Sequence, residues 1–158
     1  MPHPAYEALR YLYLVTLLAA CGYAAWRGGV AERWGAGIQF TTSFASLPAV
    51  IIAGAAGWET GQGALLLVDL IALAAFMTLA LRSTAFWPLW VAGFHLDAVL
   101  THFAKLIAPD TLPKGYALLQ GFWAYPLMAA LVVGAWHHAR AGRDEAGSAR
   151  PQRGVDTP

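Results

Sequence analysis

The chain has few of the features on which soluble enzymes and secreted domains depend. It contains one cysteine in 158 residues, which excludes an internal disulfide. Charged residues make up 12% of the composition, compared with roughly 25% in a typical soluble domain. The formal net charge is only +1 and no basic cluster is interleaved with aromatic residues, so nothing indicates nucleic-acid binding.

Motifs of the common catalytic and metal centres are also absent. The sequence has no HExxH or CxxC pattern of zinc ligands and no GxSxG pattern of a serine hydrolase. The cysteine, Cys21, lies in an apolar stretch with no predicted base beside it. These absences favour a nonenzymatic protein with no catalytic residue and no metal site.

Apolar residues, in contrast, are abundant. They make up 58% of the chain, and the mean hydropathy is +0.50. Five apolar stretches of about 20 residues are each long enough to cross roughly 30 Å of hydrocarbon. They cover residues 9–26, 37–56, 63–81, 85–107 and 116–136. Because the links are short, we expect one all-α integral membrane bundle of five transmembrane helices over residues 1–139, followed by a disordered cytoplasmic tail over residues 140–158.

The basic residues predict how this bundle is oriented. One side of the predicted bundle holds Arg27, Arg33, Arg82, Arg140 and Arg143, and the other holds Arg10, Lys105 and Lys114. Short cytoplasmic loops carry the excess of Lys and Arg, so the N-terminus is expected outside and the C-terminus in the cytoplasm. Trp26, Trp34, Trp87 and Trp136 fall at the predicted inner boundary, where aromatic residues are enriched.

The first apolar stretch contains a lipobox, the pattern at which a lipoprotein signal peptide is cleaved. Leu18, Ala19 and Ala20 precede Cys21 in the required order. The apolar run continues past the cysteine through Trp26, however, as it does in a spanning helix. Cleavage would also leave the basic residues outside, so an uncleaved helix is favoured, while acylation of Cys21 stays open.

The second stretch carries small residues at every fourth position. They are Gly37, Thr41, Ala45, Ala49, Ala53 and Gly57. This spacing lets two helix backbones approach closely in a membrane. The stripe Ala45, Ala49, Ala53 and Gly57 therefore predicts a close partner helix, either within the bundle or in a homo-oligomer or membrane complex.

Ionisable residues inside the third and fourth stretches are the candidate functional residues, since each needs a partner, water or a ligand. Asp69 lies in the third stretch, and the fourth carries His95, Asp97, His102 and Lys105. His95 and His102 are two helical turns apart and share one face, whereas Asp97 and Lys105 share a second face. Counting depth from the boundaries places Asp69 level with His102, which predicts a contact between them.

Three functions fit this pattern. The favoured one is an accessory or oligomer-forming subunit whose buried cluster of Asp69, Asp97, His102 and Lys105 binds a proton or ligand. A second is a redox anchor holding quinone or haem at His95 and His102, although these lie about 10 Å apart along one helix and cannot both ligate one haem. The third is proton-coupled permeation of a small solute through Asp69 and His102.

The C-terminal half also carries a set of distinctive strings. They are Arg82-Ser83, Phe86-Trp87-Pro88-Leu89-Trp90, Gly93-Phe94, Thr101-His102 and Gln120-Gly121-Phe122-Trp123-Ala124-Tyr125-Pro126. In these strings the chain resembles a group of uncharacterised small bacterial inner-membrane proteins. The resemblance implies a multi-pass protein of the bacterial inner membrane and implies no activity or functional residue.

Overall fold

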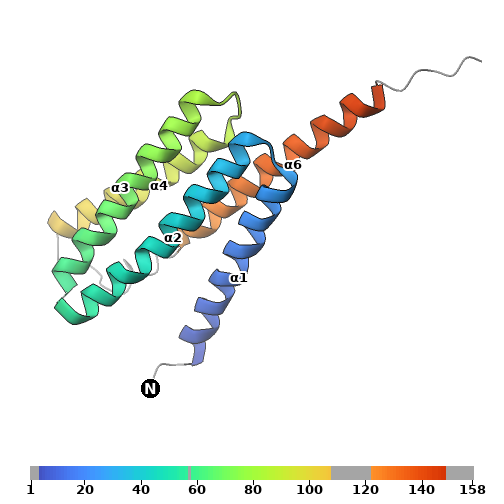
Figure 1. The fold of residues 1–158 in the computed structure, drawn as a ribbon. Helices are drawn as coiled ribbons and strands as arrows, with labels where there is room; N and C mark the ends of the chain where they lie inside the picture. The colour runs from blue at the N-terminus through green and yellow to red at the C-terminus, as the bar shows by residue number, and fades with distance from the viewer. Residues whose placement is uncertain (1–3, 57, 108–121, 149–158) are drawn as a thin grey trace, which may run out of the picture.

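The computed structural model describes residues 4–56, 58–107 and 122–148, and these residues form helices and no strand. The five helices are α1 (Pro4–Arg27), α2 (Val30–Ala56), α3 (Trp58–Arg82), α4 (Trp87–Ile107) and α6 (Ala124–Ser148). Each helix runs back alongside the one before it (Figure 1). The predicted all-α architecture is therefore confirmed.

Local sequence explains the turn between α1 and α2. The amide of Gly28 still donates to the carbonyl of Ala24, 2.9 Å away, and a Cβ atom at Gly28 would collide with the Glu32 side chain and the Ala24 carbonyl, so the turn requires glycine there. The amide of Gly29 donates to the Glu32 carboxylate, with Gly29 N 2.9 Å from Oε2. A carboxylate in the first helical turn that bonds the amide just before the helix is one half of a capping box, and it fixes where α2 begins.

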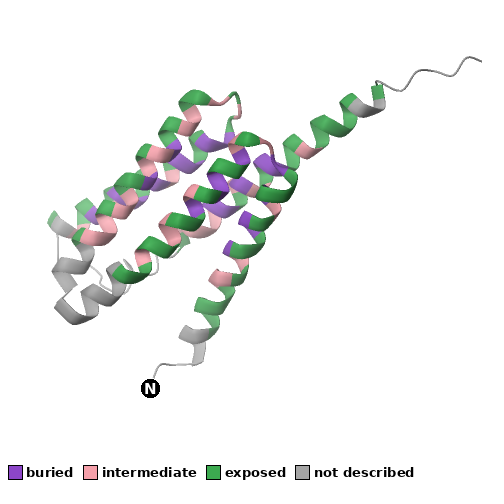
Figure 2. Cartoon of the chain, viewed as in Figure 1, coloured by how far each residue is buried: buried purple, intermediate pink, exposed green. Residues whose placement is uncertain are grey.

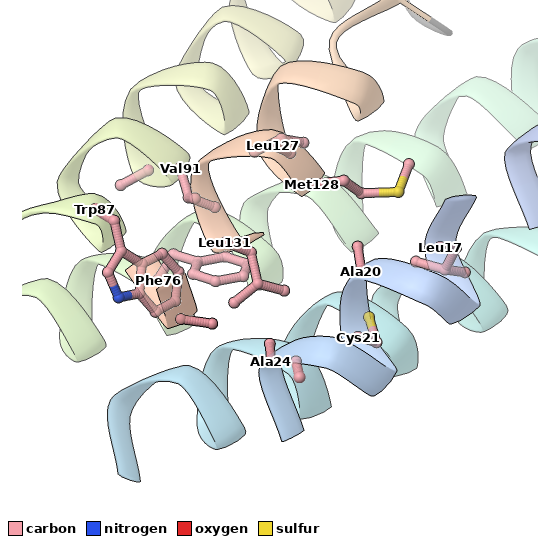
Figure 3. Close-up of a cluster of buried hydrophobic side chains, with 13 residues drawn as sticks. Leu17, Ala20, Cys21, Ala24, Phe76, Trp87, Val91, Leu127, Met128 and Leu131 are labelled. Carbon is pink, nitrogen blue, oxygen red and sulfur yellow. The ribbon is translucent and has the colours of Figure 1, made fainter. Parts of the chain in front are cut away.

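The helices form a closed arrangement around one core. Helix α1 packs against α2 and α6, α3 packs between α2 and α4, and α4 packs against α6, while α2 also contacts α6. Buried residues lie on the inward faces of the helices and exposed residues on the outward faces (Figure 2). Helix α1 contributes Leu17, Ala20, Cys21 and Ala24 to the core, so Cys21 packs there as a small buried residue (Figure 3).

Trp87, in the first turn of α4, lies at one edge of this core (Figure 3). Its indole Nε1 donates to Oε1 of Glu32, 2.8 Å away. A Cβ atom at Gly35 on α2 or Gly134 on α6 would collide with the indole ring, so both glycines are needed to admit it. The ring also meets Phe76 of α3 edge-on, with centroids 6.5 Å apart. One side chain therefore joins α2, α3, α4 and α6.

Burial sets Trp87 apart from the other tryptophans predicted at the inner membrane boundary, and that boundary itself stays a prediction. Trp87 is 7% exposed, whereas Trp26 and Trp34 are exposed. A tryptophan is fully buried when its N–H finds an acceptor, and Glu32 provides one. Pro88 follows in the first turn of α4, where a missing amide costs little.

The last helix differs from the prediction at its C-terminal end. Helix α6 continues through Ser148, so the predicted start of the disordered tail at residue 140 is too early. Extending an existing helix costs far less than nucleating one, and Ala139 and Ala141 are strong helix formers. The predicted start of this helix at residue 116 and the tail beyond residue 148 lie outside the described residues.

The outward surface of the bundle is strongly apolar. Two helical segments, Ala8–Arg27 and Gly63–Arg82, are long and apolar enough to cross a membrane. Only 11% of the second segment's most apolar window is buried inside the chain. Large exposed apolar side chains include Leu12 and Val15 on α1, Phe40 and Phe44 on α2, Leu67 and Ile71 on α3, and Trp90 and Leu100 on α4. Such a surface needs an apolar covering.

We predict that Trp87→Phe destabilises the fold by roughly 1–3 kcal/mol, because it leaves the buried Glu32 carboxylate without one of its two N–H donors. Unfolding in mixed detergent micelles measures the effect. Trp90→Phe is the matched control on the exposed face of the same helix. Equal stability of the two variants would contradict the role given to the indole N–H.

Candidate functional site

The contact predicted between the third and fourth helices is present. His102 Nε2 on α4 lies 3.0 Å from Asp69 Oδ2 on α3, a hydrogen bond in which the imidazole N–H donates to the carboxylate. The His102 side chain is 2% exposed and that of Asp69 is 22% exposed. The pair therefore joins two neighbouring helices away from bulk water.

A second histidine faces the same carboxylate. His95 Nδ1 lies 3.8 Å from Asp69 Oδ1, so each carboxylate oxygen is directed at a different imidazole. The His95 ring stacks on Phe76, with centroids 5.4 Å apart. Both ring nitrogens of His95 are buried without a hydrogen-bond partner among the described residues. A proton gained by His95 would turn the 3.8 Å approach into an ion pair.

Helical periodicity explains why these side chains meet. Asp69, Ala72 and Phe76 follow one another at steps of three and four residues, so they share the face of α3 that contains buried Ala72 and Phe76. His95 and His102 are seven residues apart and share the inward face of α4. We call Asp69, His95 and His102 the acid–histidine cluster.

Asp97 does not belong to this cluster, contrary to the prediction that grouped it with Asp69, His102 and Lys105. It is exposed, and it lines a surface hollow of about 450 Å³. The other residues lining the hollow are Phe86, Leu89, Trp90, Gly93 and Phe94. Asp97 lies two residues beyond His95, about 200° around the helix, on the second face that the sequence predicts for it. Lys105 lies one turn beyond His102 with a partly exposed side chain.

Sequence reasoning missed one buried carboxylate. Glu32 is 4% exposed, and its two oxygens accept hydrogen bonds from the Gly29 amide and the Trp87 indole. The spacing from Gly29 to Glu32 is that of a capping box with glycine in place of serine or threonine, which was the available signal. The bond to Trp87, 55 positions along the chain, has no local signal.

The small-residue stripe of α2 faces away from the bundle in its described half. Gly37, Thr41 and Ala45 are exposed, and a Cβ atom at Gly37 would have no neighbour within 4 Å. The side chains of Ala49 and Ala53, and the whole of Gly57, lie outside the described residues. The partner helix expected against this stripe remains a prediction.

Quinone or haem binding at His95 and His102 also remains a prediction. Both histidines face the same carboxylate on α3. Within the described ranges, no group of three or more His, Cys, Asp or Glu residues could hold a metal ion. The arrangement is suited to exchanging protons and fixing two helices together.

Comparison of the chain with known protein families, characterised proteins and solved structures gives no match. The resemblance to small bacterial inner-membrane proteins therefore stays a prediction. Any functional conclusion has to come from the residues and their geometry.

We expect the Asp69–His102 hydrogen bond to appear as an interaction energy of roughly 0.5–3 kcal/mol in a double-mutant cycle with Asp69→Asn and His102→Gln. The free energy of unfolding of the four proteins in detergent gives this value. A second cycle with Asp97→Asn and His102→Gln serves as the control and should be additive. Coupling of equal size in both cycles would contradict a specific pair.

Proposed function

We propose that the chain is a multi-pass protein of the bacterial inner membrane that acts as a nonenzymatic accessory subunit of a larger membrane assembly. All five helices would span the bilayer in this arrangement, and α4 would dock against a helix of the partner. The proposal is supported by the apolar exterior, by the distribution of charge along the bundle, and above all by the position of Asp97.

The exterior favours lipid as the surroundings. A core helix of a soluble protein is mostly buried, whereas the Gly63–Arg82 window is 11% buried. Helices α2, α4 and α6 pack directly against α1 or α3, the two helices that contain these segments. If α1 and α3 span the bilayer, the three helices packed beside them lie at the same depth in it. Each helix packs against the next and α6 packs back against α1, which supports a bundle in which all five helices span.

Charge supports the proposed orientation, with the N-terminus outside. Arg27 and Arg82 end α1 and α3, and Arg140 lies in the C-terminal half of α6, so antiparallel packing brings the three toward one end of the bundle. Arg27 lies over the Trp26 ring at 4.4 Å and Arg140 over Trp136 at 4.6 Å. Arginine paired with tryptophan is suited to the headgroup layer.

Asp97 is the observation that carries the accessory role. It lies in the middle of α4, exposed, beside the hollow lined by Trp90 and Phe94. A carboxylate that faces lipid there is costly, so a membrane protein retains one where a partner covers it. Charge complementarity points to a partner helix that presents Lys or Arg at the same depth. A two-fold dimer through this face would oppose Asp97 with Asp97, which favours a different chain.

We predict that a photoreactive residue in the hollow, Trp90→p-benzoylphenylalanine, crosslinks to one other membrane protein in native membranes. The crosslinked peptide should contain a Lys or Arg within an apolar span. Asp97→Asn should lower the yield about tenfold, which corresponds to loss of roughly 1.4 kcal/mol of binding. Mass spectrometry of the adduct identifies the peptide.

The control places the same photoreactive residue at Phe44, which is exposed on α2. That position should not give the same adduct. An adduct at position 90 with twice the mass of the chain would show a second copy and contradict a different partner. Adducts with lipid alone would contradict docking at α4.

Proton transfer is a second candidate function, favoured by the acid–histidine cluster. Asp69 lies between two buried imidazoles, at 3.0 Å from one and 3.8 Å from the other. A proton moving from His102 to His95 by way of the carboxylate would travel along about two turns of α4. Histidine and carboxylate groups at staggered depths are the usual parts of a membrane proton relay.

If the cluster carries protons, Asp69→Asn and His102→Gln should each lower proton flux about tenfold or more, because each removes a proton-exchanging group from the path. Proteoliposomes with an internal pH-sensitive dye measure the flux under an imposed pH gradient. Asp97→Asn is the control and should leave the flux unchanged. Wild-type flux in both cluster variants would rule out the relay.

A further inference from the structure

A second site lies at the basic end of the bundle, away from both the acid–histidine cluster and Asp97. A cavity of about 740 Å³ opens between the start of α2, the end of α3 and the later part of α6. The volume is in the range that accommodates a small organic ligand. Its lining divides into a polar half at the helix ends and an apolar half between α2 and α3.

The polar half carries two basic side chains and a hydroxyl group. Arg82 ends α3 and His138 comes from α6, and both line the cavity. The His138 ring rests on Gly29, where a Cβ atom would come within 2.6 Å of Cε1, so the glycine allows the ring to take this position. Ser83 also lines the cavity, and its Oγ is buried with no hydrogen-bond partner among the described residues.

Backbone and acidic groups are consistent with an anion in this half. Val30 and Ala31 line the cavity in the first turn of α2, where amides have no acceptor within the helix. Glu32 is the carboxylate nearest to these groups, and it also lines the cavity. Both of its oxygens already accept N–H donors, from Gly29 and Trp87, which stabilise the carboxylate without removing its charge, so the positive charge that an anion requires has to come from Arg82 and His138.

The apolar half extends from the helix ends toward the middle of the bundle. Ile38 lies two turns into α2, and Ala75 and Leu79 lie within the last two turns of α3. These residues provide a wall without charged side chains. A ligand that fills the whole cavity is therefore amphipathic, with an anionic group at one end and a hydrocarbon chain at the other.

We propose that this cavity binds a phosphate-bearing anion in the form of an anionic phospholipid. The phosphate would pair with Arg82 and His138, while an acyl chain lies along Ile38, Ala75 and Leu79. Arginine is well suited to phosphate because its N–H groups match two oxygens at once. The inference rests on the proposed membrane location and does not depend on docking at Asp97.

The test uses the full chain purified into nanodiscs of phosphatidylcholine with a minor fraction of phosphatidylglycerol. Native mass spectrometry counts the phosphatidylglycerol molecules that stay bound after release from the disc. Arg82→Gln should lower this retention at least about fivefold, equivalent to roughly 1 kcal/mol. Arg143→Gln removes an equal charge from an exposed position on α6 outside the cavity, and it should retain the lipid as the wild type does.

A second variant, which fills part of the cavity, distinguishes a bound lipid from bound free phosphate. It also keeps the proposal testable if the Arg82→Gln protein fails to fold. Ala75→Leu narrows the apolar half and should lower retention of phosphatidylglycerol while the basic groups remain. Wild-type retention in Arg82→Gln, or equal loss in Arg143→Gln, would overturn the site. If the protein binds inorganic phosphate, and Ala75→Leu leaves that binding unchanged, the ligand of the cavity is free phosphate and not a phospholipid. Crosslinking at position 90 tests the proposed docking of α4 separately, so a failure of the lipid site can be distinguished from a failure of the proposed function.

Discussion

The hydrogen bond between Trp87 and Glu32 is the interaction on which the rest of the bundle depends. A tryptophan and a carboxylate are both costly to bury alone, and each removes the cost of the other because the indole N–H has an acceptor and the carboxylate a donor. Glycines at positions 35 and 134 leave room for the ring, and Phe76 meets its edge. The start of α2 is thereby fixed relative to α4, and α4 in turn carries both histidines.

Position along the chain and helical period were enough to predict the contact between Asp69 and His102. Both residues lie in apolar stretches with definite ends, so their depths could be counted. The two-turn spacing predicted that His95 shares the face of His102, but its approach to Asp69 was not predicted. Asp97 was grouped with them wrongly, because every ionisable residue of these stretches was taken to need a partner inside the bundle, although helical period already placed Asp97 on a second face.

Other features depend on pairings that no local pattern encodes. Glu32 and Trp87 are 55 positions apart, and no sequence pattern near either residue predicts that they are hydrogen-bonded. The cavity between α2, α3 and α6 is a property of three helices together, and of its basic residues Arg82 was predicted only as a marker of orientation. The end of α6 was misjudged for a different reason, since a polar composition was taken to mean disorder although the helix was already nucleated.

The length of α6 has a mechanical consequence. The helix is continuous from buried Leu131 and Ala135 to exposed Ser148 (Figure 1), so its charged end moves as a rigid extension of its packed part. The segment beyond Ala135 forms a lever arm of about 20 Å. A tilt of about 10° at the core would displace its tip by about 3 Å. Small repacking around Trp87 would thus become a movement large enough for another molecule to sense.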